Sequence, residues 1–335
     1  MTKGYHNYRG RGRRQKRLLA VILVLVILAA TAFLVIQNYI VYDDQGQAHI
    51  EWPFRKEEPQ PDDQPPAVSD GDVTIDYIDN AYMPRLQELH ARMLPGGALR
   101  QSVQKTMDSF AEDAFAVEVK RVNGSLPYAT EVAVPQEVET EQGVTTDDLR
   151  GLTAAGRYAI ARMSVFCDSY FVRAYPDAAL HWEGGDFWYD AAGMAWLDPS
   201  HPQTLVYVTQ LCQEYASLGF DEIMLDYFSY PTVGETGFIG GLADTDREEV
   251  LTDFVKSLRA NLPKETKLSI VLRSDLTEES GLSAEMLAQR FDRVYVQPGV
   301  DLESLRRSLP EKFDQATRLV PAVTEVPESG SYLIS

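Results

Sequence analysis

The sequence contains few residues of the kinds that form disulfide bonds or bind metal ions. Cys167 and Cys212 are the only cysteines in 335 residues, so neither a disulfide framework nor a cysteine metal cluster is predicted. We expect two buried free thiols, with a single bridge as the alternative. The five histidines form no H-x-H or H-E-x-x-H pattern, which disfavours a zinc hydrolase or deacetylase. We therefore predict no metal site.

Motifs that bind nucleotides or activate a serine are also missing. The sequence has no G-x-G-x-x-G or Walker pattern and no G-x-S-x-G elbow, which disfavours nucleotide-binding folds and serine esterases. No cofactor is predicted from these patterns.

Positive charge is scarce beyond the first residues of the chain. Residues 1–17 carry seven Lys or Arg and no acid, which leaves 24 basic against 50 acidic residues in the remainder, a net charge of −26. Such an acidic body would repel a phosphate backbone, so nucleic acid is not expected as a partner.

One long hydrophobic run stands out near the N-terminus. Residues 18–36 are apolar or small and uncharged, long enough to cross roughly 30 Å of hydrocarbon. The alternative is a signal peptide, but residues 31–39 make a poor small-residue cleavage site, which favours an uncleaved anchor. By the positive-inside rule, the basic tail 1–17 stays in the cytoplasm and the rest is extracytoplasmic, giving a single-pass type II protein of the cell membrane.

The remaining chain divides into a spacer and a folded domain. Residues 43–72 are rich in Pro, Asp, Glu and Gln, which is typical of a disordered linker, here assigned to 37–72. The domain covers 73–335. Its first segment, 73–94, fits either a helix or a strand at 86–94.

Helices and strands then alternate in a regular order. We predict helices at 99–110, 146–155, 202–218, 247–262, 283–290 and 302–309, and strands at 114–120, 157–166, 220–227, 267–273, 292–297 and 318–323. Ser200 with Gln203 three residues later predicts a capping box at the start of the 202–218 helix. The alternation indicates βαβ units and a parallel sheet, either a closed barrel or a doubly wound open sheet.

The strand 220–227 places Asp226 at its C-terminal end, where catalytic residues lie in a (β/α)8 barrel. Side chains that share the parity of Asp226 on neighbouring strands would face the same interior. The polar members of this set are Glu118, Lys120, Arg162, Asp226, Arg273 and Gln297. They predict a ligand site at the strand ends, with a buried ion-pair network as the alternative.

Glycoside hydrolysis usually needs two carboxylates, one as the acid and one as nucleophile or base. Asp226 would be one of them. Glu118 is the best-placed partner by parity, and Asp168 and Asp275 are loop-borne candidates that could equally cap a turn or helix. The insertion 170–199 predicts a hairpin around Gly184 and Gly185 that covers the barrel mouth.

Aromatic residues of this insertion could form a sugar-binding wall. Trp182 and Trp188 are the expected exposed platforms, whereas Trp196 is expected to pack the hairpin onto the barrel. Tyr227, next to Asp226, is a further candidate for substrate binding.

Three segments together resemble a known bacterial family. They are Tyr158-Ala-Ile-Ala-Arg162-Met-Ser-Val-Phe166, Trp196-Leu-Asp-Pro199 and Gly219-Phe-Asp-Glu-Ile-Met-Leu-Asp226-Tyr-Phe-Ser-Tyr-Pro231. The chain resembles, over roughly residues 86–330, the "putative glycoside hydrolase" domains, which are TIM barrels grouped with glycosidases. Glu118-Val-Lys120 followed by Asn123-Gly124 is similar to the family's second-strand Asp-Val-Lys and its Asp-Gly turn.

The resemblance implies a barrel with Arg162 on the third strand and Asp226 on the fourth. The chain departs from the family pattern at Val271, where members tend to have Asp, and at Gln297-Pro298-Gly299, which replaces an aromatic-proline ending. The remaining residues 332–334 would supply a short last strand.

The sequence thus predicts a (β/α)8 TIM-barrel-like domain, with a short or irregular last strand, behind one transmembrane helix. The expected function is hydrolysis of a polysaccharide or cell-wall glycan. The expected catalytic residues are Asp226, Glu118 and Asp275, and the expected substrate-binding residues are Arg162, Lys120, Trp182, Trp188, Tyr227, Arg273 and Gln297. The alternative is a degenerate barrel that binds envelope glycan or serves as an envelope scaffold.

Overall fold

The computed structural model of the chain describes residues 40–42, 48–50, 86–95, 99, 108 and 110–335. The chain divides into two units, residues 1–75 and 76–335. In the first unit, β1 (Ile40–Tyr42) pairs antiparallel with β2 (Ala48–Ile50), inside the segment predicted as a linker. The predicted tail 1–17, the predicted membrane span 18–36 and most of the predicted helix 99–110 lie outside the described residues. No helix in the described ranges is long and apolar enough to cross a membrane.

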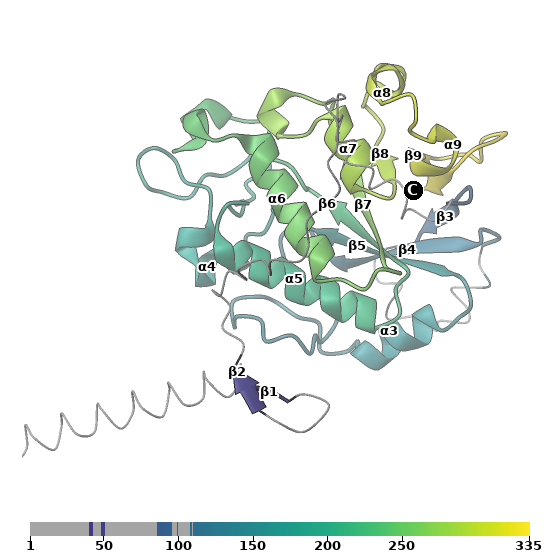
Figure 1. Cartoon of the computed structure of the whole chain (residues 1–335), viewed down its shortest axis with the longest axis horizontal. Coiled ribbons are helices and arrows are strands. Elements are labelled where there is room, and N and C mark those ends of the chain that lie inside the picture. Colours follow the sequence, from purple (N-terminus) through teal and green to yellow (C-terminus); the bar gives the residue numbers. More distant parts are fainter. Residues whose placement is uncertain (1–39, 43–47, 51–85, 96–98, 100–107, 109) are drawn as a thin grey trace, which may run out of the picture. The chain divides into compact units, whose positions relative to one another are not determined.

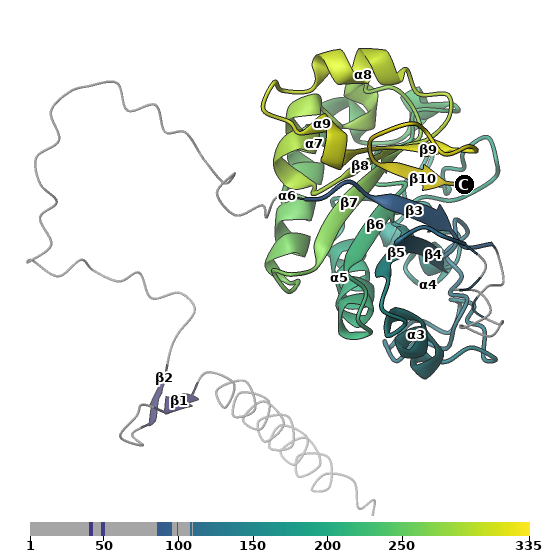
Figure 2. The same cartoon turned by 90° about the vertical axis from the view of Figure 1, so that its right-hand side faces the viewer.

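The second unit contains a closed barrel of eight parallel strands, in the order β10-β3-β4-β5-β6-β7-β8-β9 (Figures 1 and 2). The strands are β3 (His90–Met93), β4 (Ala114–Lys120), β5 (Tyr158–Ser164), β6 (Glu222–Asp226), β7 (Lys267–Leu272), β8 (Val294–Val296), β9 (Leu319–Val323) and β10 (Tyr332–Ile334). The barrel, the short last strand and the strand interpretation of 86–94 are confirmed, and the open sheet is excluded. Arg162 and Asp226 lie on the third and fourth barrel strands.

Helices follow most of the strands and lie outside the barrel. They are α3 (Thr146–Thr153), α4 (Phe171–Ala174), α5 (Pro202–Ser217), α6 (Arg247–Ala260), α7 (Ala284–Arg290), α8 (Leu302–Ser308) and α9 (Gln315–Arg318). Figure 1 shows α5 and α6 side by side across the outer face of the strands. Their apolar stripes and the outward residues of the strands form the main core, which includes Cys167 and Cys212 as buried free thiols, as predicted.

The start of α5 differs from the prediction. His201, not Ser200, is the cap: its Nδ1 accepts a hydrogen bond from the backbone N–H of Gln203 at 3.3 Å. The Ser200 hydroxyl instead donates to Asp198 Oδ1 at 2.7 Å. A short acceptor two residues away therefore outcompetes the capping position. Gly219 ends the helix at φ +89°, a conformation that a glycine adopts without strain.

The barrel interior is layered along β6, because alternate residues of a strand face the same side. At the N-terminal end, the buried Glu222 carboxylate binds Arg293 and accepts hydrogen bonds from the hydroxyls of Tyr158, Ser269 and Tyr295 at 2.6–2.9 Å. The next layer is apolar and includes Met224. Asp226 forms the top layer, at the end where the βα loops emerge. The lower charge is fully satisfied, so only the upper layer faces the loops.

Candidate active site

Two arginines hold Asp226 at the end of β6. Arg162 of β5 donates from Nε and Nη2 to Asp226 Oδ2 at 2.9 and 2.6 Å. Arg273, just after β7, donates from Nε to Oδ1 at 2.6 Å and from Nη2 to Oδ2 at 2.7 Å. The backbone N–H of Tyr227 adds a fifth bond, to Oδ1 at 2.9 Å. The buried carboxylate is therefore fixed in position by groups from three adjacent strands.

This environment keeps Asp226 ionised. Burial by itself raises the pKa of a carboxyl group. Here the hydrogen bonds from Arg273 and the positive charges of Arg162 and Arg273 outweigh burial, so the pKa of Asp226 lies below its usual value. Asp226 therefore carries its negative charge throughout the neutral and mildly acidic range.

Glu118 lies two strands away and has the opposite character. It sits on β4 in register with Arg162, and its side chain is half-buried at the mouth of the barrel. Within the described part of the chain, nothing donates a hydrogen bond to its carboxylate. Burial raises the pKa of Glu118 against the opposing charges of Arg162 and Arg121, and the charge of Asp226 raises it further. Glu118 thus retains its proton to a higher pH than an ordinary glutamate.

Lys120 does not join this group, and its assignment to substrate binding is wrong. The register of β4 against β5 shifts between Glu118 and Lys120, a β-bulge that turns Lys120 to the helix side of the strand. Its Nζ lies 2.8 Å from Asp168 Oδ2, and both side chains are 0% exposed. Asp168 Oδ1 in turn accepts the backbone N–H groups of Tyr170 and Phe171 at 3.0 and 2.7 Å. The two residues form a structural ion pair.

Tyr227 has a strained backbone directly after Asp226. Its φ is +54°, and it is the one residue other than glycine with positive φ among those that the structure describes. This conformation costs of order 1–3 kcal/mol and is found mainly at functional sites. The Arg273 guanidinium lies over its ring at 4.2 Å, and Trp196 meets the ring edge-on at 5.8 Å. Tyr227 is half-buried at the mouth, consistent with its predicted place in the site.

The tryptophans of the insertion are arranged differently from the prediction. The turn at residues 183–186 forms as expected, with His181 bridged to Phe187. Trp188 is 0% exposed, so the prediction that it is an exposed sugar platform is wrong: its indole N–H donates to the Glu235 carbonyl at 3.3 Å beneath the β6–α6 loop. Trp182 is half-buried and packs against Phe238.

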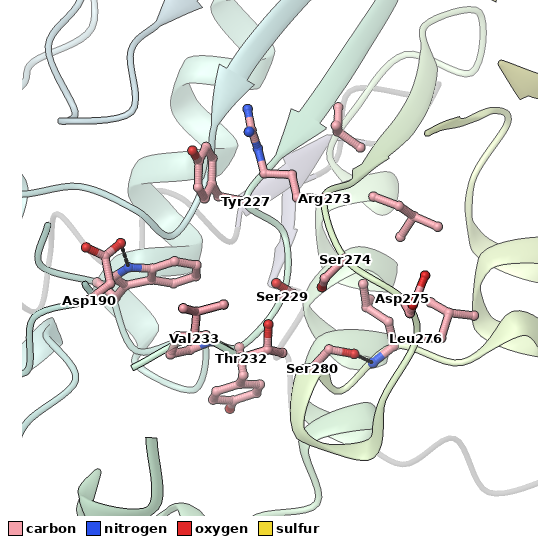
Figure 3. A pocket seen from close by; sticks show the side chains of 16 residues that line it. Asp190, Tyr227, Ser229, Thr232, Val233, Arg273, Ser274, Asp275, Leu276 and Ser280 are labelled. Carbon is pink, nitrogen blue, oxygen red and sulfur yellow. Dashed lines mark hydrogen bonds between the residues drawn. The ribbon is translucent and has the colours of Figure 1, made fainter. Parts of the chain in front are cut away.

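Trp196, expected only to pack, borders a pocket beside the arginine clamp (Figure 3). The pocket has a volume of about 220 Å³. It is lined by Asp190, Trp196, Tyr227, Ser229, Tyr230, Pro231, Thr232, Val233, Val271, Leu272, Arg273, Ser274, Asp275, Leu276, Ser280 and Leu282. Asp190 Oδ2 accepts the indole N–H of Trp196 at 3.0 Å and fixes that wall. Ser229 and Ser274 were missed by the sequence analysis, although each lies within three residues of Asp226 or Arg273.

The remaining predicted residues lie at the edge of the site. Asp275 is exposed in the pocket, and its Oδ1 accepts the backbone N–H of Asp301 at 2.7 Å. Gln297 is half-buried just after β8. Val271, at the position where the resemblance led us to look for an acid, belongs to the apolar interior layer and to the floor of the pocket. No group of three or more His, Cys, Asp or Glu suited to a metal ion occurs among the described residues.

A closed parallel barrel whose strand ends carry a clamped carboxylate, a free carboxyl group and an adjoining pocket is the architecture of a (β/α)8 enzyme-type domain. Residues 92–298 match the family model described as "Putative glycosyl hydrolase domain", and the chain belongs to this family. The resemblance found in the sequence is thereby confirmed. No curated protein matches the sequence significantly.

Solved structures with a similar fold include three from bacteria. A hypothetical protein from Ruminiclostridium thermocellum is 22% identical, with a TM-score of 0.45 over 54% of this chain and 96% of that one. The α-galactosidase of Thermus thermophilus is 14% identical, with a TM-score of 0.42 over 63% of this chain and 42% of that enzyme. The glycoside hydrolase domain of PelA from Pseudomonas aeruginosa is 12% identical, with a TM-score of 0.39 over 63% and 67%.

Proposed function

We propose that the protein hydrolyses glycosidic bonds of a polysaccharide, with Glu118 and Asp226 as the paired carboxylates. The observation that carries this proposal is the contrast between them. One carboxyl group is unpartnered with a raised pKa, and the other is clamped with a lowered pKa, at the same end of one barrel. Two carboxyl groups whose pKa values are pushed apart are suited to acid and base roles.

The environments assign the roles. Glu118, protonated to a higher pH, donates its proton to the glycosidic oxygen as the bond to the anomeric carbon breaks. Asp226, always ionised, stabilises the positive charge that develops on the sugar ring or attacks the anomeric carbon. Arg162 and Arg273 hold Asp226 in place and keep it from taking up a proton. Asp275 is a less suitable acid, because it is exposed and one of its oxygens already accepts a backbone N–H.

The location of this activity follows from the sequence alone. We propose that residues 18–36 anchor the chain in the cell membrane and that the barrel acts on the extracytoplasmic side, where cell-wall or environmental polysaccharides occur. The basic residues 1–17 support this orientation.

Release of reducing ends from a panel of polysaccharides tests the proposed function. The full-length protein is expected to cleave at least one member of the panel. Glu118→Gln should lower the rate about 10²–10⁴-fold, the usual contribution of a general acid. A matched control is Glu183→Gln, in the exposed turn of the insertion. Equal activity of Glu118→Gln and wild type would contradict the assignment.

A second candidate function is glycan binding without hydrolysis. It is favoured by one observation: five hydrogen bonds occupy the two oxygens of Asp226, which weakens them as a nucleophile or base. This candidate predicts binding of a glycan with no reducing ends released from it over long incubation. Turnover that Asp226→Asn removes would exclude it.

A further inference from the structure

The pocket bordered by Trp196 and Ser274 has a lining that is specific in its charge. Hydroxyl groups of Ser229, Thr232 and Ser274 lie on its walls, and Figure 3 shows the side chains of Ser229 and Ser274 facing each other. The floor is apolar, with Val271, Leu272 and Leu282. Hydroxyl donors and acceptors above an apolar floor suit a ligand that is itself amphipathic, as a sugar ring is.

Negative charge dominates the groups that face this pocket. Asp275 uses Oδ1 for the backbone N–H of Asp301, and within the described part of the chain Oδ2 has no partner. Asp190 accepts hydrogen bonds from the indole of Trp196 and from the backbone N–H groups of Ala192 and Met194 at 2.9 Å each, but no described cation neutralises it. Two uncompensated carboxylates would repel an anionic ligand.

Arg273 is the one cation in the pocket lining, and its charge is used elsewhere. Its Nε and Nη2 bind Asp226, and its guanidinium covers the ring of Tyr227. Figure 3 shows the guanidinium beside Tyr227, directed away from Ser229 and Ser274. The positive charge therefore serves the clamp and does not offset Asp190 and Asp275 across the pocket.

The size of the pocket limits its occupant. Its volume of about 220 Å³ lies below the range of roughly 300–1,000 Å³ that holds drug-sized ligands. Its rim is formed by Tyr227 and Arg273, the residues that contact Asp226. A single ring of a longer glycan fits this position, next to the bond that Glu118 and Asp226 would cleave.

We infer that this pocket is a subsite for one sugar ring that carries no negative charge, with Asp275 Oδ2 accepting hydrogen bonds from its hydroxyl or amino groups. This inference rests on the proposed function for the identity of the ligand as a glycan. It adds that uronic-acid and sulfated glycans are excluded from the position beside Arg273.

The test is binding of the full-length protein, in a detergent without a sugar headgroup, to a printed array of neutral, amino, uronic-acid and sulfated glycans. Titration calorimetry with the best neutral or amino glycan then gives Kd for wild type, Asp275→Asn and Ser274→Val. Asn at 275 keeps an oxygen for the backbone N–H of Asp301, so the loop is preserved. The matched control is Asp253→Asn, the same charge change on the exposed face of α6.

We expect neutral or amino glycans to bind and anionic ones not to. Asp275→Asn should weaken binding about ten-fold or more, as expected for loss of a hydrogen bond to a charged group, and Asp253→Asn should leave Kd unchanged. Preferred binding of uronic-acid or sulfated glycans, an unchanged Kd in Asp275→Asn, or no binding across the array would each overturn the inference.

The outcomes also separate this inference from the proposed function. If Glu118→Gln abolishes turnover while Asp275→Asn alters neither Kd nor KM, the hydrolase assignment stands and the subsite is wrong. If binding depends on Asp275 and no reducing ends appear, the subsite stands and the protein binds glycans without cleaving them.

Discussion

At the scale of single residues, the site depends on how differently two carboxyl groups are treated. Asp226 receives five hydrogen bonds, two of which come from each arginine. Glu118 is in register with Arg162, yet the guanidinium nitrogens that bind a carboxylate are directed to Asp226. The arginine is thus shared electrostatically but bound to only one of the two acids, which leaves the other able to hold a proton.

The raised pKa of Glu118 predicts the pH dependence of activity. Because the acid must be protonated, kcat should fall as pH rises through this pKa, and the fall should lie above the ordinary glutamate value of 4.5. A profile of kcat against pH checks this. A fall centred at or below 4.5 would mean that Glu118 is not the proton donor.

The clamp around Asp226 predicts a large effect on stability. Asp226→Asn removes the charge that pairs Arg162 with Arg273, and loss of one partner of a buried ion pair typically costs about 3–5 kcal/mol. Urea unfolding at neutral pH measures this difference. Since the pKa of Asp226 is lowered on folding, its contribution is complete above the unfolded pKa and is lost as pH falls through the folded pKa. The difference between the two proteins should therefore shrink in acid, and a difference independent of pH would contradict the clamp.

At the scale of structural elements, strand β4 shows how a single irregularity changes the role of a residue. Alternation along 114–120 places Glu118 correctly in the barrel mouth, and the same rule predicts Lys120 beside it. The bulge between them adds one residue and reverses the direction of Lys120. Lys120 then pairs with Asp168 between the barrel and the helices.

This buried pair can be tested by a double-mutant cycle. Lys120→Met leaves the Asp168 charge buried without its partner and should destabilise the protein by about 3–5 kcal/mol. Adding Asp168→Asn, which keeps an oxygen for the backbone N–H groups of Tyr170 and Phe171, should recover much of this loss. Urea unfolding of the two single variants and the double variant gives the coupling energy. Additive effects would show that the two groups do not interact.

The sequence predicts elements better than it predicts their irregularities. Hydrophobic alternation and helix stripes locate β4, β5, β6, α5 and α6 to within a few residues, because these features depend only on local periodicity. The bulge after Glu118 and the cap at His201 depend on contacts with other segments, so no local pattern marks them. The same limit applies to the insertion, where the three-dimensional packing of two loops decides that Trp188 is buried and Trp196 borders the pocket.

At the scale of the whole molecule, the barrel explains why distant residues meet. Glu118, Arg162, Asp226 and Arg273 come from four consecutive strands, and parallel strands bring their C-terminal ends to one rim. Parity predicts these four correctly because their strands are regular up to that point. The pocket, by contrast, is built from loops after β6 and β7 together with the insertion, whose conformations periodicity does not determine.

The proposed anchor gives a prediction for the intact chain. Full-length protein expressed in a bacterial host should sediment with membranes, and deletion of residues 1–36 should move it to the soluble fraction. Protease added outside cells with a permeabilised outer layer should degrade the barrel domain but spare an epitope tag at the N-terminus. Protection of the barrel domain in intact cells would contradict the orientation that residues 1–17 predict.

The central claim is that Glu118 donates the proton that releases the leaving group, and leaving-group dependence tests it most directly. A dinitrophenol needs no protonation to depart, whereas a sugar alcohol does. On dinitrophenyl glycosides of the preferred sugar, Glu118→Gln should keep the bond-cleavage step within about ten-fold of wild type, while on the unactivated glycan it should lose about 10²–10⁴-fold. Single-turnover measurement of that step on both substrates gives the comparison. Equal losses on the two substrates, or no loss on either, would contradict the account.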